Sequence, residues 1–156
     1  SAYFYGLLYN AKKNNMIDDL MAYVDITDDT TRKKQCYWQM IRTIKKNDSD
    51  PSLEAQLYLK AVDLYDEEYK YLASLLNSFA WRMTEIGQLL PEALEKVNYA
   101  LEIEDDLKIL DTKAEVLWKL GRVEEAIEVI NECIQGNPEY QHYQDQKAKF
   151  LATKAL

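Results

Sequence analysis

The chain has 156 residues, of which 47% are apolar and 29% charged, and its formal net charge at pH 7 is −8. This apolar share excludes an intrinsically disordered chain, and the length suffices for a domain with a sizeable core. Nucleic acid and anionic membranes are disfavoured as partners, because both reward clustered Lys and Arg, whereas acidic residues here are spread along the chain. With only 4 Gly and 3 Pro, the composition favours an all-helical fold.

Membrane insertion and cysteine chemistry find little support in the sequence. No apolar run approaches the roughly 18 residues of a membrane-spanning helix, so we expect no membrane span. Cys36 and Cys133 stand far apart and form no C-x-x-C motif. Both are interpreted as small buried hydrophobes, although a disulfide between them stays open. The one basic cluster, Arg32-Lys33-Lys34, is interpreted as the solvated face of a helix.

The N-terminal residues already follow an amphipathic pattern, with no initiator Met and no signal peptide. We interpret the chain as a piece of a longer protein, from which any targeting signal would be missing. The compartment, cytoplasm or periplasm, is therefore left open.

Residues 1–70 are predicted to form degenerate helical hairpins. Phe4, Leu7 and Ala11 share one helical face, and a second amphipathic segment follows Asn14-Asn15. A further helix is predicted over Arg32–Lys46. The next is predicted to begin at Pro51, with Asp50 as its N-cap.

The clearest pattern is a two-helix unit written twice, over residues 74–106 and 107–140. Gly87 recurs as Gly121, and Ala93 recurs as Ala126. The interval from Gly87 to Gly121 is one residue longer than the interval from Ala93 to Ala126. The turn after Gly87 therefore contains an inserted residue. A two-helix period of roughly 34 residues indicates a helical repeat array, in which each turn is short enough that the two helices pack antiparallel.

These residues resemble the tetratricopeptide repeat. That motif has a small residue in the first helix, a Gly-containing turn, then Glu-Ala, an apolar residue, a small residue and a terminal Pro. The second copy supplies them as Ala114, Gly121, Glu125-Ala126, Ile130, Cys133 and Pro138. The first copy supplies Ala80, Gly87, Glu92-Ala93, Val97 and Ala100 but lacks the Pro. The resemblance implies stacked antiparallel hairpins in a right-handed array, with residues 1–156 as a single domain.

The C-terminal stretch, residues 140–155, is predicted to be a helix that caps the array. Asn137 is expected to cap this helix and Pro138 to begin it. The side chains expected to face inward are Tyr143, Ala148, Leu151 and Ala155. Repeat arrays need such a terminal helix to cover the last apolar face.

A second resemblance concerns the segment Leu76–Trp81 and its counterpart Ile109–Ala114. Both are similar to the C-terminal helical part of certain bacterial thioredoxin-like proteins, in which a redox domain precedes a short repeat tail. This resemblance implies that the chain is the C-terminal part of such a protein.

No catalytic, cofactor-binding or metal-binding constellation is evident in the sequence. The single histidine, His142, excludes a His-rich metal site and is interpreted as a surface residue. Acidic pairs such as Asp105-Asp106 are adjacent in sequence, and adjacent side chains on a helix point in different directions. We therefore expect a protein that is not an enzyme and that needs no cofactor.

Partner binding is the better-supported role. In tetratricopeptide arrays the first helices of the hairpins line the concave face, where partners commonly lie. The resemblance therefore implies six partner-binding candidates on the two first helices: Ser78, Arg82, Glu85, Asp111, Glu115 and Trp118. Because the acidic residues would repel an acidic ligand, the expected partner is a neutral or basic protein or peptide.

The leading hypothesis is a non-catalytic protein–protein interaction module. The alternative is a purely structural or dimerisation domain of the parent protein, in which a homodimer would bury the face of the first helices.

Overall fold

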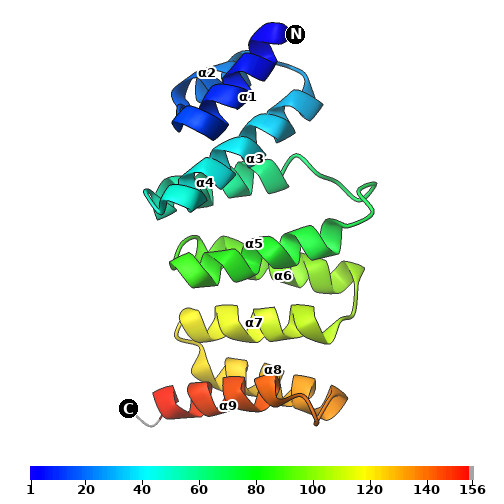
Figure 1. The fold of residues 1–156 in the computed structure, drawn as a ribbon. Coiled ribbons are helices and arrows are strands. Elements are labelled where there is room, and N and C mark those ends of the chain that lie inside the picture. Colours follow the sequence, from blue (N-terminus) through cyan, green and yellow to red (C-terminus); the bar gives the residue numbers. More distant parts are fainter. Residues whose placement is uncertain (155–156) are drawn as a thin grey trace. The chain divides into compact units, whose positions relative to one another are not determined.

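The computed structural model describes residues 1–154. Over this range the regular elements are nine α-helices and no strand, so the all-α prediction is confirmed (Figure 1). The chain divides by its contacts into two compact units, Ser1–Glu68 and a second that begins at Tyr69. The single domain expected over residues 1–156 stays a prediction. The two units are defined by their contacts, and contacts alone do not say whether each unit folds independently.

The first unit contains α1 (Ala2–Asn14), α2 (Asp18–Ile26), α3 (Thr30–Asn47) and α4 (Pro51–Val62). The long helix α3 contacts the other three. Their shared core includes Phe4, Leu20, Met40 and Ile44, each at most 4% exposed. The hairpin expected at the start of the chain is present as α1 and α2. α3 begins and ends close to its predicted bounds, and α4 begins at Pro51 as predicted.

Capping explains where the helices of the first unit begin. The Asp50 carboxylate accepts a hydrogen bond from the backbone N–H of Leu53 at 3.0 Å, and Pro51 lies in the first turn, as predicted. Asp29 caps α3 in the same way through Arg32 N–H, also at 3.0 Å. Each cap satisfies a backbone donor that the helix itself cannot pair.

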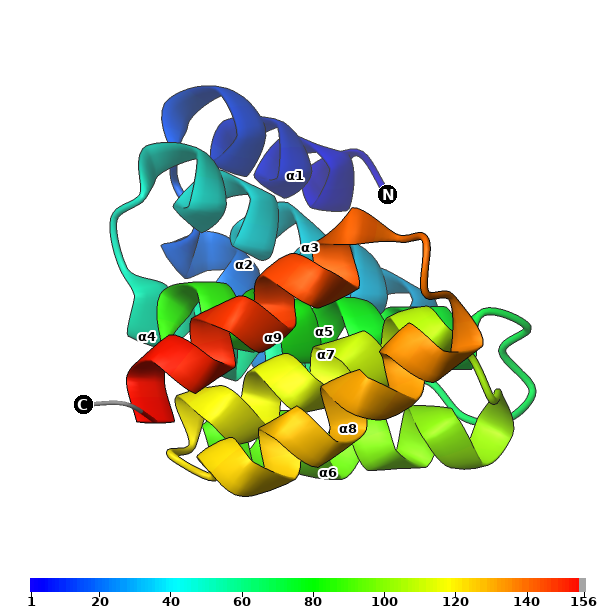
Figure 2. The same ribbon diagram turned by 90° about the horizontal axis from the view of Figure 1, so that it is seen from below.

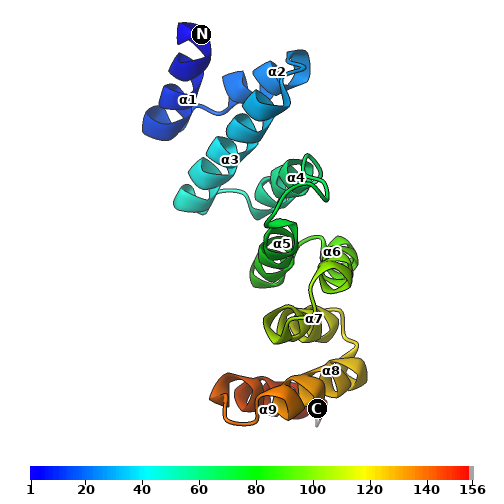
Figure 3. The same ribbon diagram turned by 90° about the vertical axis from the view of Figure 1, so that its right-hand side faces the viewer.

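The second unit contains α5 (Leu72–Ile86), α6 (Leu90–Ile103), α7 (Leu107–Lys119), α8 (Val123–Gly136) and α9 (Gln141–Lys154). α5 pairs with α6 and α7 with α8, and α7 also contacts α5 and α6. Figure 3 shows two layers in this unit, α5, α7 and α9 on one side and α6 and α8 on the other. Stacked helical hairpins are therefore the architecture of this unit.

The two Gly-containing turns follow the sequence pattern. Gly87 ends α5 with φ 65°, and Gly121 follows α7 with φ 81°. Both values lie in the left-handed region that glycine adopts without steric cost. The inserted residue of the first turn has a visible consequence, because Leu89 also adopts a positive φ of 47° before α6 begins.

Small residues lie where the helices approach closely, as expected. Ala80 and Ala114 in the first helices, and Ala93 and Ala126 in the second helices, are all 0% exposed. A larger side chain at any of these points would force the paired helices apart.

The C-terminal helix differs from the prediction at its start. α8 continues through Gly136, and Pro138 lies in the turn rather than at the head of α9, which begins at Gln141. Asn137 therefore does not cap α9. A Cβ atom at Gly136 would lie 2.7 Å from Leu107 Cδ1. Glycine at this position, the last residue of α8, therefore allows α8 to pack closely on α7.

The inward face of α9 was also predicted wrongly. Tyr143 is buried as expected, but Ala148 and Leu151 are exposed, and Gln146 and Phe150 are buried instead. Residue 155 lies outside the described residues. Figure 2 shows α9 alongside α8, and in the described part of the chain it contacts α7 and α8. α9 thus packs on the α7–α8 hairpin as α7 packs on the α5–α6 hairpin.

Both cysteines are free and buried, so the expectation of small buried hydrophobes is confirmed. Burial raises the pKa of the Cys36 thiol to about 11 and that of Cys133 to about 12. The basic cluster Arg32-Lys33-Lys34 is half-buried and not fully solvated. The Arg32 guanidinium lies 5.0 Å from the centre of the Phe4 ring, and Lys34 Nζ lies 4.0 Å from that of Tyr65. None of the helices within residues 1–154 has the length and apolar character needed to cross a membrane.

Candidate partner-binding surface

The six candidate residues fall into two groups on the first-helix layer of the second unit. Ser78, Arg82 and Glu85 lie on α5, where Ser78 and Glu85 are exposed and Arg82 is half-buried. The Arg82 guanidinium lies 3.8 Å from a carboxylate oxygen of Glu85, one helical turn later. This group forms a polar, partly accessible strip on α5.

Asp111, Glu115 and Trp118 lie on α7 and are covered by α9. Asp111 is 7% and Glu115 6% exposed, and Trp118 is half-buried. Their spacing, i, i+4 and i+7, places all three on one helical face. In this structure α9 therefore covers the face of α7 that carries these three candidates, and their role in partner binding stays a prediction.

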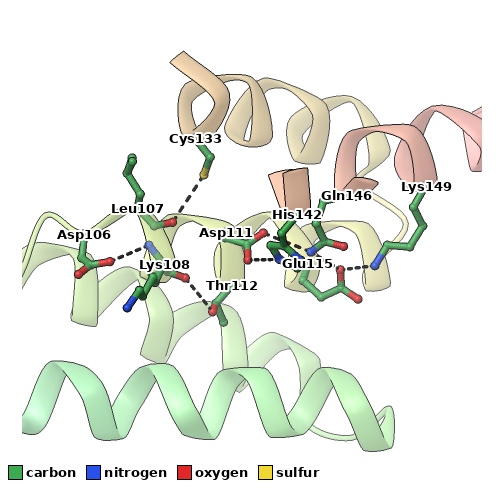
Figure 4. A network of polar contacts seen from close by, with 10 residues as sticks. All are labelled: Asp106, Leu107, Lys108, Asp111, Thr112, Glu115, Cys133, His142, Gln146 and Lys149. Carbon is green, nitrogen blue, oxygen red and sulfur yellow. Dashed lines mark hydrogen bonds and ion pairs between the residues drawn. The ribbon is translucent and has the colours of Figure 1, made fainter. Parts of the chain in front are cut away.

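The carboxylates of Asp111 and Glu115 are bridged by one amide (Figure 4). Gln146 Nε2 lies 3.2 Å from Asp111 Oδ1 and 3.0 Å from Glu115 Oε2, so its two hydrogens serve both acidic groups. Like charges four residues apart on a helix repel one another, and the bridging donor offsets this repulsion.

Basic side chains flank the bridge on each side. His142 Nε2 lies 2.8 Å from Asp111 Oδ2, and Lys149 Nζ lies 2.6 Å from Glu115 Oε2. Because a carboxylate oxygen only accepts, the imidazole Nε2 carries the hydrogen of this bond. Two buried carboxylates would be costly without partners, and here each has a basic group and a shared amide.

Trp118 completes the contact at the other end of α9. Its Nε1–H donates to Thr153 Oγ1 at 3.0 Å, and its ring lies 5.7 Å from that of Phe150. Lys149 Nζ lies 4.4 Å from the Trp118 ring, a cation–π distance. The indole is thus an anchor for α9 rather than a free recognition residue.

The set of contacts between α7 and α9 is termed the α7–α9 ladder. It joins three residues of α7 to four of α9: Asp111, Glu115 and Trp118 with His142, Gln146, Lys149 and Thr153. The sequence singled out the three α7 residues as partner-binding candidates and missed the α9 residues that contact them. A signal was present, since residues 142, 146, 149 and 153 follow helical spacing on a stretch whose apolar pattern is weak.

The side chains next to the α7–α9 ladder are buried between helices. Cys133 Sγ lies 3.6 Å from the Leu107 carbonyl oxygen, and burial raises the pKa of Tyr143 to about 12. Among residues 1–154, no group of three or more His, Cys, Asp and Glu side chains is placed to hold a metal ion.

No protein-family model matches this sequence, and no curated protein matches it.

Proposed function

We propose that this chain is a non-catalytic protein–protein interaction module of the tetratricopeptide kind. The observation that carries the proposal is the α7–α9 ladder, in which the first-helix face of one hairpin binds another helix through carboxylates and an indole. The bound helix presents neutral and basic groups, His142, Gln146 and Lys149. A partner of the same chemistry fits the first-helix layer.

The accessible part of that layer is the strip on α5. Ser78 and Glu85 are exposed there, and Glu85 is close to Arg82 at its edge. A rim of exposed charge beside half-buried groups is common at protein interfaces. The partner site is therefore proposed at the α5 strip. The α7–α9 ladder holds together the next helices of the same unit, of which α7 contacts α5.

The parent protein is proposed to be a larger bacterial protein of the thioredoxin-like kind, with this chain as its C-terminal part. The proposal rests on the segments Leu76–Trp81 and Ile109–Ala114, which both lie within first helices, α5 and α7. The sequence encoded upstream tests it: a redox domain with a C-x-x-C motif supports this parentage, and its absence rejects it.

The binding function is tested by capture of proteins from an extract of the cell that encodes the chain. The test variants are the pair Arg82→Ala with Glu85→Ala, and Ser78→Tyr. The control is Glu95→Ala with Glu128→Ala, two exposed residues of the second-helix layer. We expect a partner that wild type and control retain and that both test variants lose.

Two results would reject the proposal. One is a set of captured proteins that the α5 variants and the control retain equally. The other is a stable dimer in sedimentation that the α5 variants dissociate, because the first-helix face would then serve self-association, as the structural alternative states.

A further inference from the structure

A cluster of basic residues lines a hollow in the first unit, on a chain whose net charge is −8. Lys12 and Lys13 come from the end of α1, and Arg42 and Lys46 come from α3. The hollow has a volume of about 540 Å³, and no acidic residue lines it. These four side chains and the space between them are termed the basic hollow.

The four cations have no carboxylate partner among residues 1–154. Elsewhere in the chain basic groups do pair, as Arg122 with Glu125 at 2.6 Å and Lys149 with Glu115 at 2.6 Å. The chain contains 27 acidic and 19 basic residues, so carboxylates are plentiful. Four converging cations without a carboxylate partner in the described residues therefore mark a place where positive charge is concentrated.

Helix-end electrostatics explains part of this arrangement. Lys12 and Lys13 lie in the last turn of α1 and Lys46 in the last turn of α3, where cations interact favourably with the helix dipole. Arg42 lies before the last turn of α3, and Lys45 shares that last turn without lining the hollow. The dipole therefore accounts for cations at the helix ends but not for their convergence with Arg42.

The floor of the hollow is built from buried polar groups. Gln39 is 8% and Thr43 6% exposed. Thr43 Oγ1 donates to the Ala11 carbonyl at 3.1 Å and accepts from Gln39 Nε2 at 3.2 Å, which ties α3 to α1. An amide nitrogen carries two hydrogens, and no described residue accepts the second one of Gln39. A buried donor at the floor is thus left for a ligand oxygen.

A second hollow, of about 420 Å³, adjoins the first and shares Gln39 and Arg42 with it. Leu8, Trp38 and Tyr65 supply its apolar walls. The Trp38 indole is held in place, since its Nε1–H donates to the Tyr65 hydroxyl at 2.9 Å. We term the two hollows together the α3 groove.

We propose that the α3 groove binds an acidic peptide segment of another protein. Carboxylate side chains of the segment lie on the basic hollow, and one apolar or aromatic side chain lies between Leu8 and Trp38. From Lys34 to Lys46 the helix rises about 18 Å, at 1.5 Å per residue, a length that five or six extended residues span at about 3.3 Å each.

A peptide fits the groove better than a nucleic acid for two reasons. The cations converge on one hollow instead of forming a long stripe, and the overall charge of −8 repels an extended polyanion. The inference goes beyond the proposed function, because it names a further class of partner and uses a different surface from the α5 strip.

The experiment measures binding of a fluorescein-labelled, end-blocked peptide, Glu-Asp-Leu-Glu-Asp-Glu, to the full chain by anisotropy at low ionic strength. The counterpart Gln-Asn-Leu-Gln-Asn-Gln is the control peptide. We expect saturable binding of the acidic peptide alone, weakened by added salt because the attraction is electrostatic. Arg42→Glu and Lys46→Glu each weaken binding by about fivefold to tenfold, since a partly exposed attraction becomes a repulsion.

Lys45→Glu is the matched control variant. Lys45 and Lys46 share the last turn of α3 and are both exposed, so both substitutions change net charge and helix-end electrostatics equally. Only Lys46 lines the hollow. We expect Lys45→Glu to change the affinity less than about twofold, in line with screening of a charge that makes no direct contact.

Three results would overturn the proposal: no saturable binding of the acidic peptide, equal weakening by Lys45→Glu and Lys46→Glu, or tighter binding of an oligothymidylate of the same net charge. Failure here remains distinct from failure of the proposed function. Loss of peptide binding with capture still dependent on Arg82 and Glu85 rejects only the groove. Peptide binding without such capture rejects the α5 strip.

Discussion

The two units use charged side chains in opposite ways. In the second unit, the carboxylates of Asp111 and Glu115 are buried and matched by groups of α9. In the first unit, Arg42 and Lys46 converge on a hollow with no carboxylate partner in the described residues. Charge that is matched inside the molecule serves the fold, whereas exposed and unmatched charge around a buried polar floor is suited to a ligand.

The largest effect expected concerns the apolar anchor of α9. Phe150 is 0% exposed and packs against Trp118, so Phe150→Ala should lower the free energy of unfolding by about 3–4 kcal/mol. Urea denaturation of the full chain measures this. Leu151→Ala, at a position 45% exposed, is the control and should cost less than about 1 kcal/mol. Equal losses would mean that α9 docks by another face.

The next effect separates matched from unmatched charge directly. Glu115→Gln should lower the free energy of unfolding by about 1–3 kcal/mol, because Lys149 and Gln146 lose a charged acceptor in a buried site. Glu132→Gln, at an exposed position of α8, is the control and should stay within about 0.5 kcal/mol. A Glu115 variant as stable as wild type would contradict a structural role for the ladder.

Alkaline pH tests whether the two cores exclude water to a similar degree. Burial raises the pKa of Cys36 from 9.0 to about 11 and that of Cys133 from 9.0 to about 12. Above pH 9 the unfolded chain releases these protons while the folded chain keeps them, so stability is fully present below pH 9 and declines as pH rises toward 11–12. The expected slope is at most about 1.4 kcal/mol per pH unit for each thiol.

Unfolding by urea across this pH range measures the decline. Tyr143 and Tyr37 also have raised pKa values and add to it above pH 10, their ordinary value. Replacing both cysteines by alanine should flatten the curve between pH 9 and 10, even though the variant starts from a lower stability. An unchanged slope in that variant would show that the thiols are not the groups responsible.

The smallest effect is expected at the unmatched cations. Arg42 is exposed, and within the chain its guanidinium donates a long hydrogen bond of 3.3 Å to Gln39 Oε1. Arg42→Gln should therefore change the free energy of unfolding by no more than about 0.5 kcal/mol. Lys149→Gln, which removes the partner of a buried carboxylate, should cost about 1–2 kcal/mol in the same assay. Equal costs would erase the contrast between the two units.

Most of the fold follows from local sequence rules. The turns at Gly87 and Gly121, the cap at Asp50 and the buried alanines each depend on one position and its near neighbours, and each is predictable. α9 is not, because its inward face depends on which helices cover it. Ala148 occupies the position in α9 that corresponds to Ala114 in α7, yet it is exposed, since α9 contacts α7 and α8 on its other side.

The candidate sites are less predictable because they depend on contacts between distant segments. His142 was interpreted as a surface residue, but the fold places it 2.8 Å from Asp111, which lies on a different helix. Lys12 and Arg42 each resemble an ordinary solvated helix residue in the sequence. Only the packing of α1 on α3 brings them to one hollow.

Amide hydrogen exchange of the full chain, with and without the peptide Glu-Asp-Leu-Glu-Asp-Glu, tests the central claim most directly. If the unmatched cations serve a ligand, the peptide slows exchange at the end of α1 and along Lys34–Lys46, because a bound state must dissociate or open before exchange. The α7–α9 ladder should exchange at the same rate in both samples. Slowed exchange at the ladder alone, or no change at α1 and α3, would contradict the assignment of the α3 groove to ligand binding.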